Sequence, residues 1–146
     1  MFVIEINICC SATTENLPYL THMVEQTLLQ EIVEEHREIA FAIHEALINA
    51  VEAVRRDHTY NVGFLTLHLK ITEQEVYVSV TNSGSAYSRY EAEYMLNQDM
   101  LQVLHQDCGR GFLFMQALMD EICIENLDNR KAFSVIMRKF RKKKEG

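Results

Sequence analysis

The stretch from Ile39 to Val51 constrains the fold more than any other part of the chain, because it is almost wholly apolar. Its only polar residues are His44, Glu45 and Asn49. Apolar residues recur at spacings of three and four, which predicts a helix with one strongly buried side. The residues of this buried stripe are Ile39, Ile43, Ala46, Leu47, Ala50 and Val54. Apolar side chains also occupy a second side, so we expect neighbouring elements to cover this helix on most sides.

Glu45 and Asn49 interrupt this apolar helix one turn apart, so their side chains lie on the same face. Burying an unpaired carboxylate is costly, which leaves two interpretations. Either local hydrogen bonds satisfy both groups in a packed interior, or the two groups line a polar cavity. A zinc-protease helix is excluded, because Ile48 stands where the second histidine of that motif would be.

Composition and charge exclude several classes of protein. The net charge of −7 argues against general binding to nucleic acid. No apolar run approaches the ~20 residues of a membrane helix, and the N-terminus lacks the features of a signal peptide. The cysteines form no C-x-x-C pair, which indicates reduced thiols in a cytoplasmic protein. We expect the basic residues at positions 138–144 to form a solvated tail.

The order of the remaining patterns predicts one α+β domain over residues 1–140, followed by a basic tail at 141–146. Strands are expected at 2–10, 63–71, 75–81, 121–125 and 132–140, and helices at 16–29, 34–56 and 112–119. The polar segment 82–107 is long enough for a mobile lid with a short helix at 88–96. Such an order is typical of a two-layer sandwich, with helices on one face of a mixed, mostly antiparallel sheet.

Three short motifs follow one another along this domain. They are Glu45-x-x-x-Asn49-Ala50, Val78-x-Val80-x-Asn82-x-Gly84 and Gly109-Arg-Gly-Phe112. In this order and spacing they resemble the nucleotide-binding boxes of the GHKL (Bergerat-fold) ATPases, over roughly residues 1–140. The stretch from Gly109 to Ile122 looks most like the anti-sigma-factor serine-kinase branch. Each motif alone is weak, whereas the ordered set is much more specific.

The resemblance implies ATP and Mg²⁺ as cofactors, and the residue types fit that chemistry. An amide oxygen is a good Mg²⁺ ligand, and a carboxylate one turn away can accept the proton of an attacking hydroxyl. Glycines before a helix let the backbone approach phosphates at the positive helix end. By resemblance, the base is Glu45, the Mg²⁺ ligand is Asn49, the adenine side is Asn82 and Gly84, and the phosphate side is Gly109, Arg110 and Gly111.

The resemblance further implies an ATP-dependent protein serine kinase in the cytoplasm. It would phosphorylate a small antagonist protein, bind a sigma factor or a similar regulator, contact neither nucleic acid nor membrane, and form a homodimer. Two alternatives remain open. Asn82 replaces the Asp that receives the adenine amino group in the family, and Ala86 replaces a glycine, which favours a partner-binding module with a degenerate nucleotide site. The other alternative is a detached ATP-binding domain of a phosphotransfer kinase.

Overall fold

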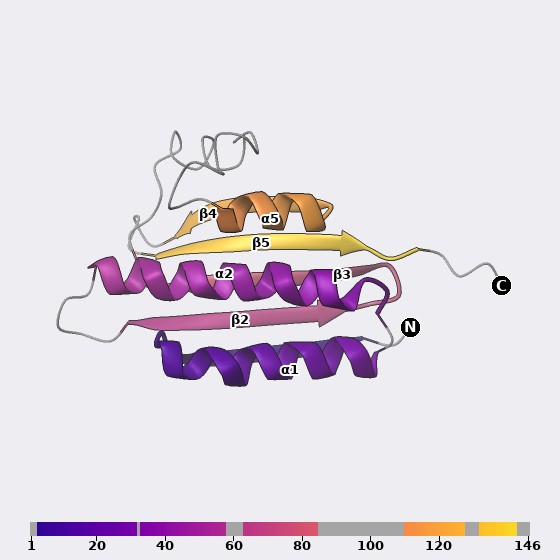
Figure 1. Cartoon of the computed structure of the whole chain (residues 1–146), viewed down its shortest axis with the longest axis horizontal. Helices are drawn as coiled ribbons and strands as arrows, with labels where there is room; N and C mark the ends of the chain where they lie inside the picture. The colour runs from indigo at the N-terminus through magenta and orange to yellow at the C-terminus, as the bar shows by residue number, and fades with distance from the viewer. Residues whose placement is uncertain (1–2, 32, 58–62, 85–109, 128–131, 143–146) are drawn as a thin grey trace.

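The computed structural model describes residues 3–31, 33–57, 63–84, 110–127 and 132–142, in which helices pack on a five-stranded sheet (Figure 1). The elements in chain order are β1 (Ile4–Ser11), the 3₁₀ turn η1 (Thr14–Asn16), α1 (Leu17–Gln30), α2 (His36–Asp57), β2 (Phe64–Ile71), β3 (Glu75–Asn82), α5 (Arg110–Leu118), β4 (Glu121–Leu127) and β5 (Ala132–Phe140). The expected lid and short helix at 88–96, and Gly109, lie outside the described residues.

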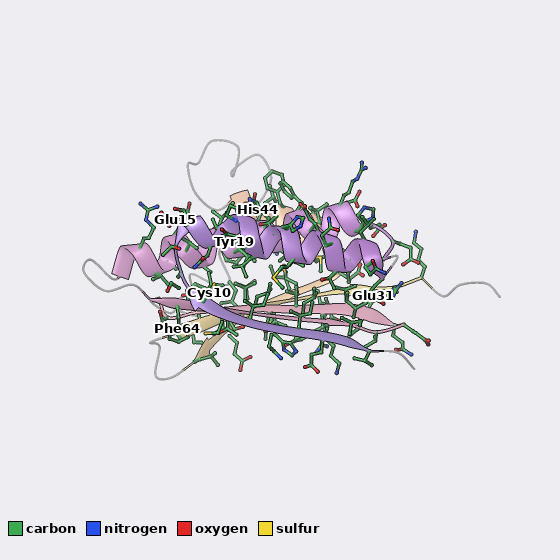
Figure 2. The ribbon with its side chains drawn as sticks, turned by 90° about the horizontal axis from the view of Figure 1, so that it is seen from below. Cys10, Glu15, Tyr19, Glu31, His44 and Phe64 are labelled. Atoms are coloured by element: carbon green, nitrogen blue, oxygen red, sulfur yellow. The ribbon has the colours of Figure 1, made fainter. Side chains whose placement is uncertain are left out.

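The sheet has the strand order β1-β2-β3-β5-β4, and each pair of neighbouring strands is antiparallel. Figure 2 shows two layers, with the helices on one face of the sheet. The predicted α+β sandwich of helices on a largely antiparallel sheet is therefore confirmed. Within the part of the chain that the structure describes, no helix is long and apolar enough to cross a membrane.

Helix α2 lies in the middle of the helical layer, between α1 and α5 and over the sheet (Figure 1). All six residues of the predicted buried stripe are at most 2% exposed. On the outer surface, Phe41 of α2 meets Phe114 of α5 edge to face, with ring centroids 5.4 Å apart. The expectation that this helix is covered on most sides is thus confirmed, since α1, α5 and the sheet pack around it.

Alternating residues of the strands form the part of the core that belongs to the sheet. On β3, the side chains at Val76, Val78, Val80 and Asn82 are buried, and the intervening positions are only partly covered. Asn82 pairs with Leu65 of β2 and Phe133 of β5, both of which are fully buried. The last residue of an otherwise apolar row is therefore an asparagine, in the central strand of the sheet.

Several predicted element ends need correction. Asn16 occupies the N-cap position of α1, but its side chain caps nothing and instead donates to the Ser11 carbonyl oxygen at 2.8 Å. Helix α2 begins at His36 rather than Glu34, because Glu35 has the left-handed φ of 57°. Helix α5 begins at Arg110, two residues earlier than expected, so Gly111 lies in its first turn.

The interpretation of the basic cluster as a solvated tail is wrong for Lys139 and Arg141, which contact other segments of the chain. Arg138 and Lys139 belong to β5. Lys139 Nζ lies 3.1 Å from a carboxylate oxygen of Glu35, just before α2, and 3.7 Å from Asp120. Arg141 donates to the Thr72 carbonyl oxygen at 3.0 Å. These cations tie the end of β5 to the loops and to the start of α2.

Candidate functional site

Two of the three sequence motifs meet between α2 and α5. Glu45 and Asn49 are half-buried on α2, and Gly111 is buried in the first turn of α5. A Cβ atom added to Gly111 would lie 3.1 Å from both Asn49 Nδ2 and Glu45 Oε2. A side chain at position 111 would therefore crowd both polar groups. The first N–H groups of a helix have no partner inside the helix and form its positive end, so Glu45 and Asn49 face a region suited to anions.

The third motif packs against the same helix one turn further along. The Gly84 N–H donates to Asn82 Oδ1 at 2.7 Å. A Cβ atom on Gly84 would lie 2.9 Å from the carbonyl carbon and oxygen of Ala53, which follows Asn49 by four residues on α2. All three motifs, scattered in the sequence, are thus aligned along α2. Gly84 is a glycine because the loop after β3 passes so close to the α2 backbone.

This close approach predicts a stability effect at Gly84. Replacing Gly84 by alanine places a methyl group against backbone atoms that cannot rotate away, so the strand end or α2 must shift. We expect Gly84→Ala to lower the free energy of unfolding by about 1–3 kcal/mol, as other overpacking substitutions do. Urea denaturation checks this, and an unchanged midpoint would contradict the packing.

Two asparagine side chains of the motifs each have an amide nitrogen without a hydrogen-bond partner. Within the described residues, the buried side-chain nitrogen or oxygen atoms that lack a hydrogen bond are Asn49 Nδ2 and Asn82 Nδ2. Asn82 is 0% exposed. Because burying an unsatisfied donor costs about 1–3 kcal/mol, such groups call for an explanation. The interpretation of Asn49 as hydrogen-bonded in a packed interior does not account for its free Nδ2 atom.

The carboxyl group of Glu45 has a perturbed acidity. Loss of hydration on burial raises the pKa of Glu45 above its ordinary value of 4.5, His44 opposes this rise, and the negative charge of Glu52 adds to it. A carboxylate with a raised pKa is a better proton acceptor near neutral pH than an ordinary one. The acidity of Glu45 is thus consistent with the role of a base.

The raised pKa of Glu45 predicts how stability depends on pH. Because the folded-state pKa exceeds the unfolded one, the contribution of Glu45 to stability is complete below its ordinary pKa and is lost as pH rises through the folded value. The variant Glu45→Gln stays neutral. Its melting temperature should therefore rise relative to that of wild type as pH increases above the ordinary pKa of a glutamate, about 4.3.

The matched control is Glu38→Gln, an exposed position in the first turn of the same helix. We expect no comparable rise in the melting temperature of this variant. Melting curves of the three proteins at a series of pH values make the comparison. A constant difference between Glu45→Gln and wild type would contradict the assignment.

The phosphate-side residues are only partly placed. Arg110 is the first residue of α5, but its side chain lies outside the described residues, as does Gly109. Sequence reasoning missed the part that Ala53 plays, although a small residue four positions after Asn49 was a visible signal. Cys9, Cys10 and Cys123 carry free thiols. Among the described residues, no cluster of three or more His, Cys, Asp or Glu side chains is suited to a metal.

A separate hollow of about 510 Å³ lies on the other side of α2, against α1. Its lining includes Leu29, Arg37, Phe41 and His44. None of the site residues expected from the sequence lines it. His44 is hydrogen-bonded to Thr21 of α1 across 2.9 Å. This hollow is therefore a feature of the α1–α2 surface and not of the motif site.

Comparison with known proteins agrees with the fold and with the family that the sequence resembles. The model of one protein family, described as a histidine kinase-like ATPase domain, matches residues 10–139. Three nucleotide-free structures of the catalytic domain of histidine kinase ThkA share the fold, each with a TM-score of 0.59. Their sequence identities to this chain are 16%, 17% and 15%, and the alignments cover 97% of this chain and 97%, 97% and 99% of theirs. No curated protein sequence matches significantly.

Proposed function

Since the chain belongs to the histidine kinase-like ATPase family, we propose that it binds ATP with Mg²⁺ and transfers a phosphoryl group to a serine of a small antagonist protein. It would act as a cytoplasmic regulator resembling the anti-sigma-factor kinases, and would bind a sigma factor or a similar protein. The observation that carries the proposal is the pair of buried amide nitrogens without a hydrogen-bond partner, Asn49 Nδ2 and Asn82 Nδ2. Both belong to motifs that, by resemblance to the family, bind the nucleotide.

The residues present fit this ligand. The first turn of α5 supplies backbone N–H groups beside Asn49 and Glu45, and Gly111 keeps that approach open. An asparagine oxygen and phosphate oxygens together suit Mg²⁺, which holds few protein ligands. Asn49 would therefore hold the ion, and Asn82 with Gly84 would hold the base.

Glu45 has a different role from these binding residues. Its carboxylate lies beside Gly111 but carries a negative charge, which disfavours direct contact with phosphate. Its raised pKa suits it to accept the proton of a serine hydroxyl or a water. ATP supplies the activated γ-phosphoryl group, and Glu45 makes the attacking oxygen more nucleophilic.

A partner-binding module without kinase activity is the second candidate. The observation that favours it is Asn82, a neutral amide in place of the carboxylate that the family places at the adenine. In that case the helical layer would still bind a protein, whereas nucleotide would have no effect. The fold shared with the catalytic domain of histidine kinase ThkA also keeps a detached kinase domain as a third candidate.

Calorimetric titration with ATP, with and without Mg²⁺, separates these candidates. The kinase proposal expects binding that Mg²⁺ strengthens, and phosphate transfer from labelled ATP to a serine of a protein that co-purifies with the chain. Binding without any transfer would leave a nucleotide-gated module. No binding under either condition would support the degenerate site.

A further inference from the structure

Strand β1 lies at one edge of the sheet, so one side of its backbone faces away from β2. The Ala12 N–H donates to the Gly63 carbonyl oxygen at 2.9 Å, and this pair continues the register of β1 on β2. In an antiparallel pair, hydrogen-bonded residues alternate with residues whose backbone groups point to the opposite edge. The even-numbered residues of β1 therefore bond to β2, and the N–H and C=O groups of the odd-numbered residues face outward.

These outward groups form a short row along the edge. The Ser11 carbonyl oxygen already accepts two hydrogen bonds, so the row ends before it. Within the described residues, no strand lies beyond β1 to pair with the backbone groups of Glu5, Asn7 and Cys9. Figure 2 is viewed toward this edge and shows β1 in front of the other strands. Asn7 is the midpoint of the row.

Strand β1 also lacks the features that usually keep an edge strand from pairing. Its eight residues include no proline, lysine or arginine, and its register on β2 is unbroken along its whole length. Its one charged residue, Glu5, lies 2.6 Å from His68 Nε2 of β2. The other edge strand, β4, carries the exposed residues Glu121 and Glu125. Of the two edges, β1 is therefore the one suited to accept another strand.

The apolar row of β1 is covered less well than the row beside it. The core-facing side chains of β2, from Leu65 to Ile71, are at most 2% exposed. Those of β1 are only half-buried, at Ile4, Ile6, Ile8 and Cys10. A further strand at this edge would therefore remove apolar surface from water.

Helix α1 exposes two large side chains toward the same edge. Positions 20, 24 and 28 of α1 are buried, and positions 21, 25 and 29 line the hollow against α2. Tyr19 and Met23 lie on the remaining flank, which faces away from α2, and they are 73% and 45% exposed. Since α1 is the outermost helix on the β1 side of the molecule (Figure 1), this flank and the free edge of β1 lie on the same side.

We propose that two copies of the chain associate through this side, with their β1 strands paired antiparallel about a twofold axis at Asn7. In that register Asn7 lies opposite Asn7 and Glu5 opposite Cys9 of the second copy, so every outward N–H and C=O in the row gains a partner. Ile6 lies opposite Ile8 of the second copy, and no like charges meet. The two sheets become one continuous sheet. This inference does not depend on nucleotide binding.

The variant Asn7→Pro tests the pairing, because the Asn7 N–H faces outward and takes no part in the ladder to β2. Proline is tolerated at such positions of an edge strand, whereas the dimer loses two symmetric hydrogen bonds at its centre. Light scattering over a dilution series should show a wild-type dimer and a dissociation constant about 10- to 100-fold higher for Asn7→Pro. The matched control Asn7→Ser keeps the N–H and should dimerise like wild type. Met23→Lys, at an exposed position, should also weaken the dimer.

Cross-linking tests the register. The Cα atoms of a hydrogen-bonded antiparallel pair lie about 5.5 Å apart, which is within the range that a disulfide spans. Asn7→Cys in a Cys9→Ser background should therefore form a disulfide-linked dimer under mild oxidation. Lys70→Cys in the same background should not, because position 70 lies on β2, one strand away from the edge.

A wild-type chain that stays monomeric at every concentration up to about 1 mM overturns the inference. A folded Asn7→Pro that dimerises as tightly as wild type also overturns it. If Asn7→Pro does not fold, Met23→Lys and the cross-link decide: an undiminished dimer in Met23→Lys, or a dimer that Asn7→Cys does not cross-link, rejects this surface. Titration with Mg-ATP is a separate measurement, so the proposed function stands or falls independently.

Discussion

Replacing Glu45 by glutamine is expected to slow phosphoryl transfer by about 10²–10⁴-fold, the typical effect of losing a general base. Glutamine keeps the size of the side chain beside Gly111 but cannot take up a proton. The affinity for Mg-ATP should stay close to that of wild type, because the proposed contact of Glu45 is with the attacking oxygen and not with the nucleotide. At neutral pH the variant should also be more stable, since burial raises the pKa of the Glu45 carboxyl.

Single-turnover release of labelled phosphate, together with transfer to a co-purifying protein, measures the rate of phosphoryl transfer. Calorimetric titration measures the affinity for Mg-ATP. Glu38→Gln removes the same charge from an exposed position of α2 and should change neither the transfer rate nor the affinity for Mg-ATP. The role of Glu45 as a base is rejected if Glu45→Gln transfers phosphate at the wild-type rate, or if it loses ATP binding as well.

Replacing Asn49 by alanine should weaken the binding of Mg-ATP by about 10- to 100-fold, as expected for a lost contact to a charged ligand. Stability should be unchanged or higher. The Nδ2 atom of Asn49 has no hydrogen bond to lose, and alanine is a better helix former than asparagine. Weaker binding of Mg-ATP by a protein of equal or higher stability is the reverse of what we would expect if Asn49 had only a structural role.

Titration with and without Mg²⁺ and a urea denaturation curve test both parts of this prediction. Glu52→Ala, an exposed truncation on the same helix, is the control. Loss of stability without loss of affinity would show that Asn49 supports the packing of α2 and α5. Equal weakening in the presence and absence of Mg²⁺ would show that Asn49 contacts the nucleotide but not the ion.

The features that depend on local periodicity were predictable from the sequence. The buried stripe of α2 and the alternation in β3 follow from the spacing of apolar residues, and the structure has them at the expected positions. The features that depend on tertiary partners were not predictable from the sequence. Lys139 looked solvated in a run of basic residues, but Glu35 and Asp120 come from distant segments to pair with it.

The candidate site was likewise predictable only in part. The spacing of Glu45 and Asn49 placed them on one face of a helix, and resemblance alone suggested that Gly111 joins them. No sequence pattern could show that Gly84 is pressed against the Ala53 backbone, or that Asn82 bonds to its own loop. Those facts depend on how closely a loop and a helix approach, which is a property of the packed chain.

The central place of α2 also has a consequence for regulation. His44 and Glu45 are consecutive, yet His44 is bonded to Thr21 of α1 (the His44 side chain is labelled in Figure 2), whereas Glu45 faces α5. A packed helix moves as a rigid unit. If α2 moves when a ligand binds on its α5 side, the position of its α1 side also changes. If both flanks bind ligands, their binding energies become coupled, and that coupling is reciprocal. A protein seated over α1 and a nucleotide beside α5 would then change each other's affinity by the same factor.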